Sequence, residues 1–231
     1  MKENFIHVCF VIDKSGSMYA SKEDVIGGFQ KVIDEQKATQ TGQCSVSLFT
    51  FNGAVKEEYL GRDVSEISGL LDYSPDGMTA MNDGIGTAID RVGEWLRDMP
   101  EHERPEQNLI VIMTDGQENA SHKYTLSRVQ EMIKHQTDKY SWRFMYIGTD
   151  ITTTKDADTL GITMNAYSSR SNYSKSYDMI NSSVCCARNM AKGMSYSQKL
   201  ATMDSFLNEE ADKLTAETEA ELGIEIKNKA Q

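Results

Sequence analysis

Short apolar runs alternate along the chain with longer stretches in which apolar residues recur every three or four positions. The short runs are rich in β-branched and aromatic residues and predict strands, since they are too short to cross a membrane. They cover residues 5–12, 44–51, 54–60, 109–113, 142–147 and 162–167. The longer stretches have the periodicity of amphipathic helices. They cover residues 23–36, 81–99, 126–133, 154–160, 173–187 and 197–214, and residues 63–71 predict a short helix or turn.

Strands that alternate with helices predict the α/β class, with a doubly wound sheet and helices on both of its faces. Asn52 and Gly53 separate two extended runs, which is the strongest short-range signal for a hairpin. We therefore expect a mostly parallel sheet with one antiparallel edge strand. A Ser-rich stretch marks a change of character, so the predicted domain spans residues 1–168. Residues 169–231 are predicted to form a C-terminal helical extension, with a frayed polar tail from residue 216.

The first predicted strand ends in a polar loop. Asp13, Ser15 and Ser17 stand at alternate positions directly after the apolar run, and Gly16 allows the backbone to approach a ligand closely. In open α/β sheets, ligands bind at the carboxyl ends of the strands. Carboxylate and hydroxyl oxygens are the ligands that Mg²⁺ and Ca²⁺ prefer. Taken alone, this spacing has an alternative interpretation, in which Ser17 or Ser21 caps the next helix.

Two further loops carry groups of the same kind. Asp115 follows another fully apolar strand, in a Thr-Asp-Gly sequence, and Thr79 lies in the loop before the longest amphipathic helix of the sheet region. If the strands that precede Asp13 and Asp115 are neighbours, both carboxylates face one crevice, and the Thr79 loop can reach it. The three loops together predict a site for a hard divalent cation.

The order and spacing of these pieces resemble the von Willebrand factor A domain and its metal-ion-dependent adhesion site, over residues 3–168. The resemblance implies a Rossmann-like fold and a bound Mg²⁺, with Mn²⁺ or Ca²⁺ as alternatives. The residues around the Asp13 and Asp115 loops resemble those of intracellular bacterial members of the family. The ligands that the resemblance implies are the hydroxyls of Ser15, Ser17 and Thr79, and the carboxylates of Asp13 and Asp115, which would bind directly or through water.

A metal ion that is held mainly by neutral hydroxyls stays electrophilic. An open coordination position on it would favour a hard anionic oxygen, such as the carboxylate of a partner's Asp or Glu. We therefore expect a divalent-metal-dependent protein–protein interaction module, which is an adaptor and not an enzyme. The family resemblance adds an AAA+ ATPase as one partner to consider.

Two alternative functions stay open at this point. A metal-assisted phosphatase or hydrolase would use the same cation as a Lewis acid, although the sequence contains no GxxxxGK[ST], HExxH or GxSxG motif. Its candidate bases are Asp76, Asp83, Glu118 and His122, and for each of them a surface or helix-capping role is the simpler interpretation. An assembly protein would instead use the C-terminal helices to oligomerise.

Composition narrows the range of partners. The chain has 24 basic and 35 acidic residues, a net charge of −11, and no basic cluster, so we expect no nucleic-acid partner. It contains no secretory signal and no run of about 20 apolar residues, so we expect a soluble protein without a membrane partner. Of the four cysteines, Cys9 and Cys44 fall in predicted strands, Cys185 and Cys186 fall in a helix, and none forms a CxxC pair. This pattern favours a reducing, cytoplasmic location.

Overall fold

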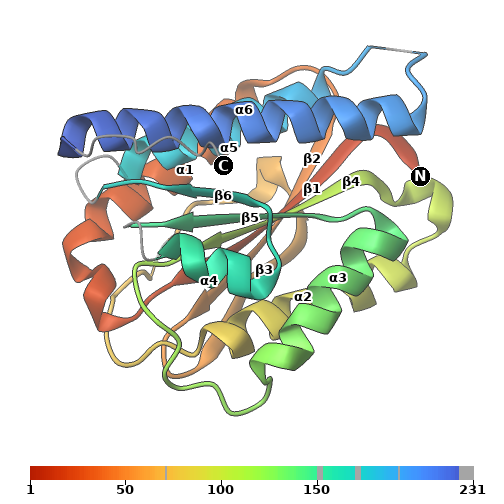
Figure 1. The fold of residues 1–231 in the computed structure, drawn as a ribbon. Helices are drawn as coiled ribbons and strands as arrows, with labels where there is room; N and C mark the ends of the chain where they lie inside the picture. Colours follow the sequence, from red (N-terminus) through yellow and green to blue (C-terminus); the bar gives the residue numbers. More distant parts are fainter. Residues whose placement is uncertain (71, 150–152, 170–172, 192, 224–231) are drawn as a thin grey trace, which may run out of the picture.

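The computed structural model describes residues 1–70, 72–149, 153–169, 173–191 and 193–223. Within these ranges, six strands form one sheet in the order β3-β2-β1-β4-β5-β6 (Figure 1). The β2–β3 pair is antiparallel and the other neighbours are parallel. The predicted fold class, with its antiparallel edge strand, is therefore confirmed. The strands are β1 (Lys2–Asp13), β2 (Gln43–Phe51), β3 (Val55–Asp63), β4 (Pro105–Met113), β5 (Arg143–Gly148) and β6 (Met164–Tyr167).

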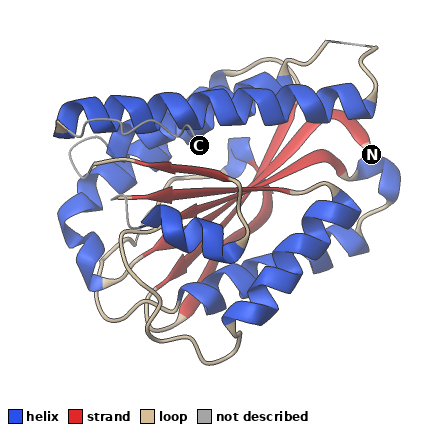
Figure 2. Ribbon diagram, viewed as in Figure 1, coloured by secondary structure: helices blue, strands red, loops and turns tan. Residues whose placement is uncertain are grey.

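Helices cover both faces of the sheet (Figure 2). Every predicted helix is present. Most bounds differ by one or two residues, but the helix predicted at 126–133 continues seven residues further and the one predicted at 197–214 continues eight residues further. The helices are α1 (Lys22–Ala38), α2 (Met81–Asp98), α3 (Leu126–Tyr140), α4 (Thr153–Leu160), α5 (Tyr173–Arg188) and α6 (Tyr196–Leu222), and the short 3-10 helices are η1 (Gly16–Ser21), η2 (Val64–Glu66) and η3 (Glu101–Glu103). Within the described ranges, no helix combines the length and the apolar character that are needed to cross a bilayer.

Parts of the chain differ from the predicted elements. The loop after β1 contains η1, which is too short for hydrophobic periodicity to reveal. The tail that was expected to fray from residue 216 instead continues α6, because Thr218 is buried and Lys175 of α5 forms ion pairs with two glutamates of α6. η2 begins the 63–71 stretch, and the last residue of that stretch lies outside the described residues. The same is true of residues 224–231 of the predicted tail.

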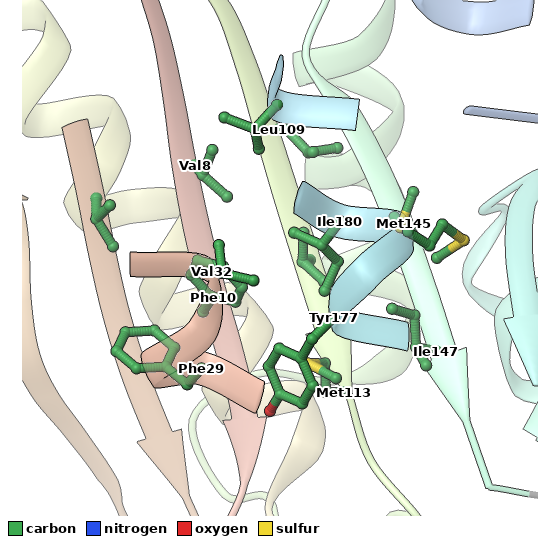
Figure 3. Packing of buried hydrophobic residues seen from close by; sticks show 14 of the residues in the cluster. Val8, Phe10, Phe29, Val32, Leu109, Met113, Met145, Ile147, Tyr177 and Ile180 are labelled. Atoms are coloured by element: carbon green, nitrogen blue, oxygen red, sulfur yellow. The ribbon is translucent and has the colours of Figure 1, made fainter. Parts of the chain in front are cut away.

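β1 and β4 are apolar on both of their faces, as central strands of a covered parallel sheet must be. Alternate residues of β1 therefore enter two separate cores. On one face, Phe10 packs edge-to-face with Phe29 of α1, with ring centroids 5.2 Å apart, and Tyr177 of α5 belongs to the same cluster (Figure 3). On the opposite face, Cys9 and Val11 pack in the core that α2, α3 and α4 cover.

The last two helices supply part of the first core. Tyr177 and Ile180 of α5 and Leu207 of α6 are fully buried. The buried guanidinium of Arg188, at the end of α5, donates hydrogen bonds to the carbonyl oxygens of Gln36 (2.7 Å) and Thr39 (2.9 Å), where α1 ends. α5 is thus joined to α1 by apolar and polar contacts. The division of the chain at residue 168 stays a prediction about which part folds as an independent unit.

Candidate metal centre

Three loops meet at the carboxyl edge of the sheet. β1 and β4 are adjacent and parallel, and their last paired residues are Ile12 and Met113. Asp13 and Asp115 consequently leave the sheet from neighbouring strands, as the sequence predicted. The loop before α2, which carries Thr79, joins them through a main-chain hydrogen bond from Asp76 N to Lys14 O (2.9 Å).

Hydrogen bonds connect four of the five predicted ligands in one chain of contacts. The backbone N–H of Ser15 donates to Oδ1 of Asp13 (2.7 Å), and the hydroxyl oxygens of Ser15 and Ser17 are 3.0 Å apart. The Ser17 hydroxyl donates to Oδ1 of Asp115 over 2.5 Å. Asp13 and Ser15 are buried, whereas Ser17 is exposed and Asp115 is half-buried. The site is thus anchored in the interior and open on the side of Ser17 and Asp115.

Gly116 shows where the fifth residue lies. A β carbon at this position would sit 3.1 Å from Oγ1 of Thr79, 3.4 Å from Oγ of Ser17 and 3.5 Å from Oδ2 of Asp13. Oxygens from the Asp13 loop and the Thr79 loop therefore lie close to the backbone of the Asp115 loop at Gly116, where a side chain would be tight against the Thr79 hydroxyl. Thr79 itself is buried. The structure brings all five predicted residues together.

The donor set fits a small, hard cation. Around an octahedral Mg²⁺ with bonds of about 2.1 Å, neighbouring oxygens lie about 3 Å apart. The 3.0 Å separation of the Ser15 and Ser17 hydroxyls has this value. Within the described part of the chain, no three residues of the types His, Cys, Asp or Glu converge on a point that could hold a metal ion. The candidate centre accordingly depends on hydroxyls together with two carboxylates.

Thr114 is a further residue of the site, beyond the five predicted ligands. Its hydroxyl donates to Oδ2 of Asp13 (2.6 Å) and accepts a hydrogen bond from the N–H of Gly116 (3.1 Å). Tyr73 provides a second support, because its hydroxyl donates to the backbone carbonyl of Asp13 (2.5 Å). A hydroxyl residue directly between a buried strand and Asp115 was the signal that could have identified Thr114; Tyr73 offered no comparable signal.

A second set of bonds fixes the Thr79 loop against the Asp115 loop. The backbone N–H of Thr79 donates to the side-chain oxygen of Asn119 (2.9 Å), and the N–H of Asn119 donates to the carbonyl of Thr79 (3.0 Å). This reciprocal pair holds the hydroxyl of Thr79 at the site. Asn119 could not be predicted from the sequence, because its hydrogen-bond partner lies 40 residues away and no local pattern links the two.

Two of the residues that a hydrolase would use as bases are occupied with structural bonds. Asp83 accepts hydrogen bonds from three consecutive backbone amides, those of residues 122–124, and Glu118 accepts them from Asn82, Ala120 and Ser121. Burial alone would raise the pKa of each carboxyl group, but these hydrogen bonds outweigh it and lower both pKa values. Both groups therefore stay ionised and act as loop supports.

The other two candidate bases are placed differently. The carboxylate of Asp76 accepts a hydrogen bond from the side-chain amide of Asn52 (2.7 Å), which ties its loop to the β2–β3 turn. His122 contributes its backbone N–H to Asp83. Neither contact connects these residues to the Asp13 carboxylate.

Burial controls the electrostatics of Asp13. Burial raises the pKa of this carboxyl group, the hydrogen bonds from Thr114 and Ser15 oppose the rise, and the negative charge of Asp115 adds a smaller increase; the resulting pKa is about 6. Two carboxylates side by side in a poorly solvated place repel each other. A divalent cation between them would remove that repulsion, so the site has a physical reason to bind positive charge.

The fold and this edge define the class of protein: a doubly wound α/β domain with an oxygen-rich cluster at the carboxyl ends of its central strands. Residues 7–182 match the von Willebrand factor type A domain, and the chain belongs to this family. No curated protein sequence matches the chain.

Solved structures share the fold at low sequence identity. The vWF domain of the type V pili tip protein Mfa5 from Porphyromonas gingivalis has a TM-score of 0.60 and 10% identity, covering 84% of this chain and 99% of that one. A von Willebrand factor type A protein from Catenulispora acidiphila has a TM-score of 0.55 and 12% identity, covering 80% and 43%. Proximal thread matrix protein 1 from the mussel byssus has a TM-score of 0.54 and 16% identity, covering 80% and 48%. The chain thus spans less than half of the last two proteins, and these similarities concern the fold alone.

Proposed function

We propose that the chain is a divalent-metal-dependent protein-interaction module whose five clustered oxygen ligands hold Mg²⁺. The observation that carries the proposal is the convergence of side-chain oxygens of Thr79, Ser17 and Asp13. They lie 3.1–3.5 Å from the point that a β carbon of residue 116 would occupy. A bound Mg²⁺ would supply an electrophilic point that a hard anionic oxygen of a partner can reach. Members of this domain family commonly mediate protein–protein interactions, and that general role extends to this chain.

The supports around the ligands favour a rigid recognition site. Thr114 and Tyr73 hold Asp13, and Asn119 holds Thr79, so the ligand atoms are positioned before any ion or partner arrives. Preorganised ligands lose little conformational entropy on binding, which raises affinity. The open side, at Ser17 and Asp115, is the side from which a partner's carboxylate would approach.

The alternative functions receive less support. Asp83 and Glu118 are already saturated by backbone amides, which leaves a hydrolase without a well-placed base among them. For an assembly protein, the apolar residues of α5 and α6 would have to face outward, yet they contribute to the core of their own chain. The adaptor role is therefore the better supported function.

The cellular setting is part of the same proposal. The four cysteines are unbridged, and Cys9 and Cys44 are buried, which suits a reducing, cytoplasmic compartment. An AAA+ ATPase remains the partner that the family resemblance suggests. The partner's carboxylate, rather than its identity, is what the site chemistry specifies.

Calorimetric titration with Mg²⁺, Mn²⁺ and Ca²⁺ tests the metal site. We expect one ion per chain in the wild type, and at least a tenfold loss of affinity in Asp115→Ala and in Thr79→Ala. Both residues lie in loops outside the apolar strands, so the melting temperature in chelator should change little. Asp138→Ala, which alters an exposed ion pair on α3, is the matched control and should bind like the wild type. Wild-type affinity in the two site variants would refute the assignment.

A further inference from the structure

Among the described residues, large hydrophobic side chains are exposed at few places. Two of the most exposed ones lie within two residues of predicted ligands in the sequence: Tyr19 is 73% exposed and Met78 is 55% exposed. Tyr19 lies in η1, two residues after Ser17, and Met78 directly precedes Thr79. The remaining exposed large hydrophobic residues of the described chain are Met1, Leu126, Tyr140 and Leu222, at the start of the chain, the two ends of α3 and the end of α6.

The two loops that carry these side chains are bonded to each other. The N–H of Gly16 donates to the carbonyl of Gly77 over 3.1 Å, three residues before Tyr19 and one residue before Met78. Gly77 has a positive φ of 73°, a conformation that turns the chain sharply before Met78. The bond between Gly16 and Gly77 joins the segments that carry Tyr19 and Met78, and Ser17 is exposed in the first of them; we call Tyr19 and Met78 the apolar rim.

The residue before Tyr19 in the chain is an apolar residue that is buried. Met18, next to Tyr19, is 0% exposed and belongs to the core beneath α1. The local chain thus buries one apolar side chain and directs the next one into solvent. Exposed apolar residues that gather next to a polar site mark protein interfaces, and Tyr and Met are enriched in the centres of interfaces.

The charge of the chain limits what can bind there. A net charge of −11 repels long acidic segments, so a partner with a run of carboxylates is disfavoured. A partner that offers one carboxylate to the ion and one large apolar side chain to the apolar rim fits both surfaces without adding to that repulsion.

We propose that the apolar rim selects the partner: Tyr19 and Met78 contact a large apolar side chain that directly neighbours the Asp or Glu bound at the metal. The proposal rests on the proposed function, since it assumes that a carboxylate completes the metal site. It specifies the partner segment as an isolated acidic residue adjacent to Leu, Ile, Met or Phe.

Selection from a displayed random peptide library on the full chain tests this proposal. The library is bound in Mg²⁺ and eluted with EDTA. We expect the eluted peptides to be enriched in a single Asp or Glu with a large apolar neighbour. The double variant Tyr19→Ser, Met78→Ser should bind those peptides at least tenfold more weakly by fluorescence anisotropy, while calorimetry gives a Mg²⁺ affinity within twofold of the wild type.

A double variant of two exposed hydrophobic residues outside the rim, Leu126→Ser with Tyr140→Ser, is the matched control and should bind the peptides like the wild type. Enriched peptides that carry an acidic residue without an apolar neighbour would overturn the rim and leave the metal-dependent function standing. A rim variant that binds the peptides normally, or one that loses Mg²⁺ affinity, would also overturn the role of the apolar rim. Failure to elute any peptide with EDTA would overturn both proposals.

Discussion

Asp13 and His7 lie six positions apart on β1, and burial disfavours the charged form of each. Asp13 is surrounded by hydroxyls and amides that stabilise its anion, and its pKa of about 6 leaves it ionised at neutral pH. His7 is fully buried, where its Nδ1 is 2.9 Å from the Ser45 hydroxyl and its ring lies 4.7 Å from the Trp95 ring. Burial lowers the pKa of His7 to about 3, although the contact with Ser45 opposes the change.

His7 makes the stability of the protein depend on pH. The unfolded chain takes up a proton at this residue near the ordinary histidine pKa of 6.5, and the folded protein does so only near 3. The neutral, buried His7 therefore makes its full contribution to stability above pH 6.5. Between pH 6.5 and pH 3 the free energy of unfolding falls by up to about 1.4 kcal/mol per pH unit. We expect urea unfolding in EDTA to show a shallower decline for His7→Gln than for the wild type. His102→Gln, on exposed η3, is the control. Equal slopes in wild type and His7→Gln would contradict this account.

The ligand residues were predictable because each follows an apolar strand or precedes a strongly periodic helix. Asp13 and Asp115 needed only the expectation that their strands are neighbours. Thr114 and Asn119 were not predictable in the same way, since they act by hydrogen bonds to other parts of the site. Their partners are set by the folded geometry. The sequence marks Thr114 only by its position between a buried strand and Asp115, and it marks Asn119 by no pattern.

At the scale of elements, α5 and α6 show how far hydrophobic periodicity carries. The helical period predicted both helices, but it could not show that α6 extends past residue 216, because its last turns are mostly polar. Tertiary contacts settle that end: Thr218 is buried, and Lys175 lies 2.8 Å from Glu221 and 3.3 Å from Glu217. Local sequence is a weak guide where the stabilising contacts come from another helix.

Removing α5 and α6 should unfold the protein. Together they bury ten apolar side chains in one core, and each large one contributes about 1.5–3 kcal/mol, against a typical total stability of about 5–15 kcal/mol. We expect a chain that ends at residue 168 to lose its cooperative thermal transition and to bind the dye ANS. A chain that ends at residue 223 keeps both helices and serves as the control. A cooperative transition in the shorter chain would instead establish residues 1–168 as an independent domain.

At the scale of the whole molecule, the sheet topology creates the site. Residues 13, 79 and 115 are far apart in sequence, and the adjacency of β1 and β4, with the loop before α2 bonded across them, brings them to one edge. The same topology leaves the open end of the cluster facing solvent beside the apolar rim. The sequence could predict the class of sheet, but the side of the site that is open, and the side chains that border it, emerged only from the folded chain.

The central claim is that five oxygen-bearing residues from three loops hold one divalent cation. A crystal structure of the full chain with Mn²⁺, with anomalous difference density, tests it most directly. The account predicts one strong peak within about 2.0–2.6 Å of the hydroxyl oxygens of Ser15, Ser17 and Thr79, with the carboxylates of Asp13 and Asp115 bound directly or through water. A peak at another place, or none between these loops at saturating Mn²⁺, would contradict it.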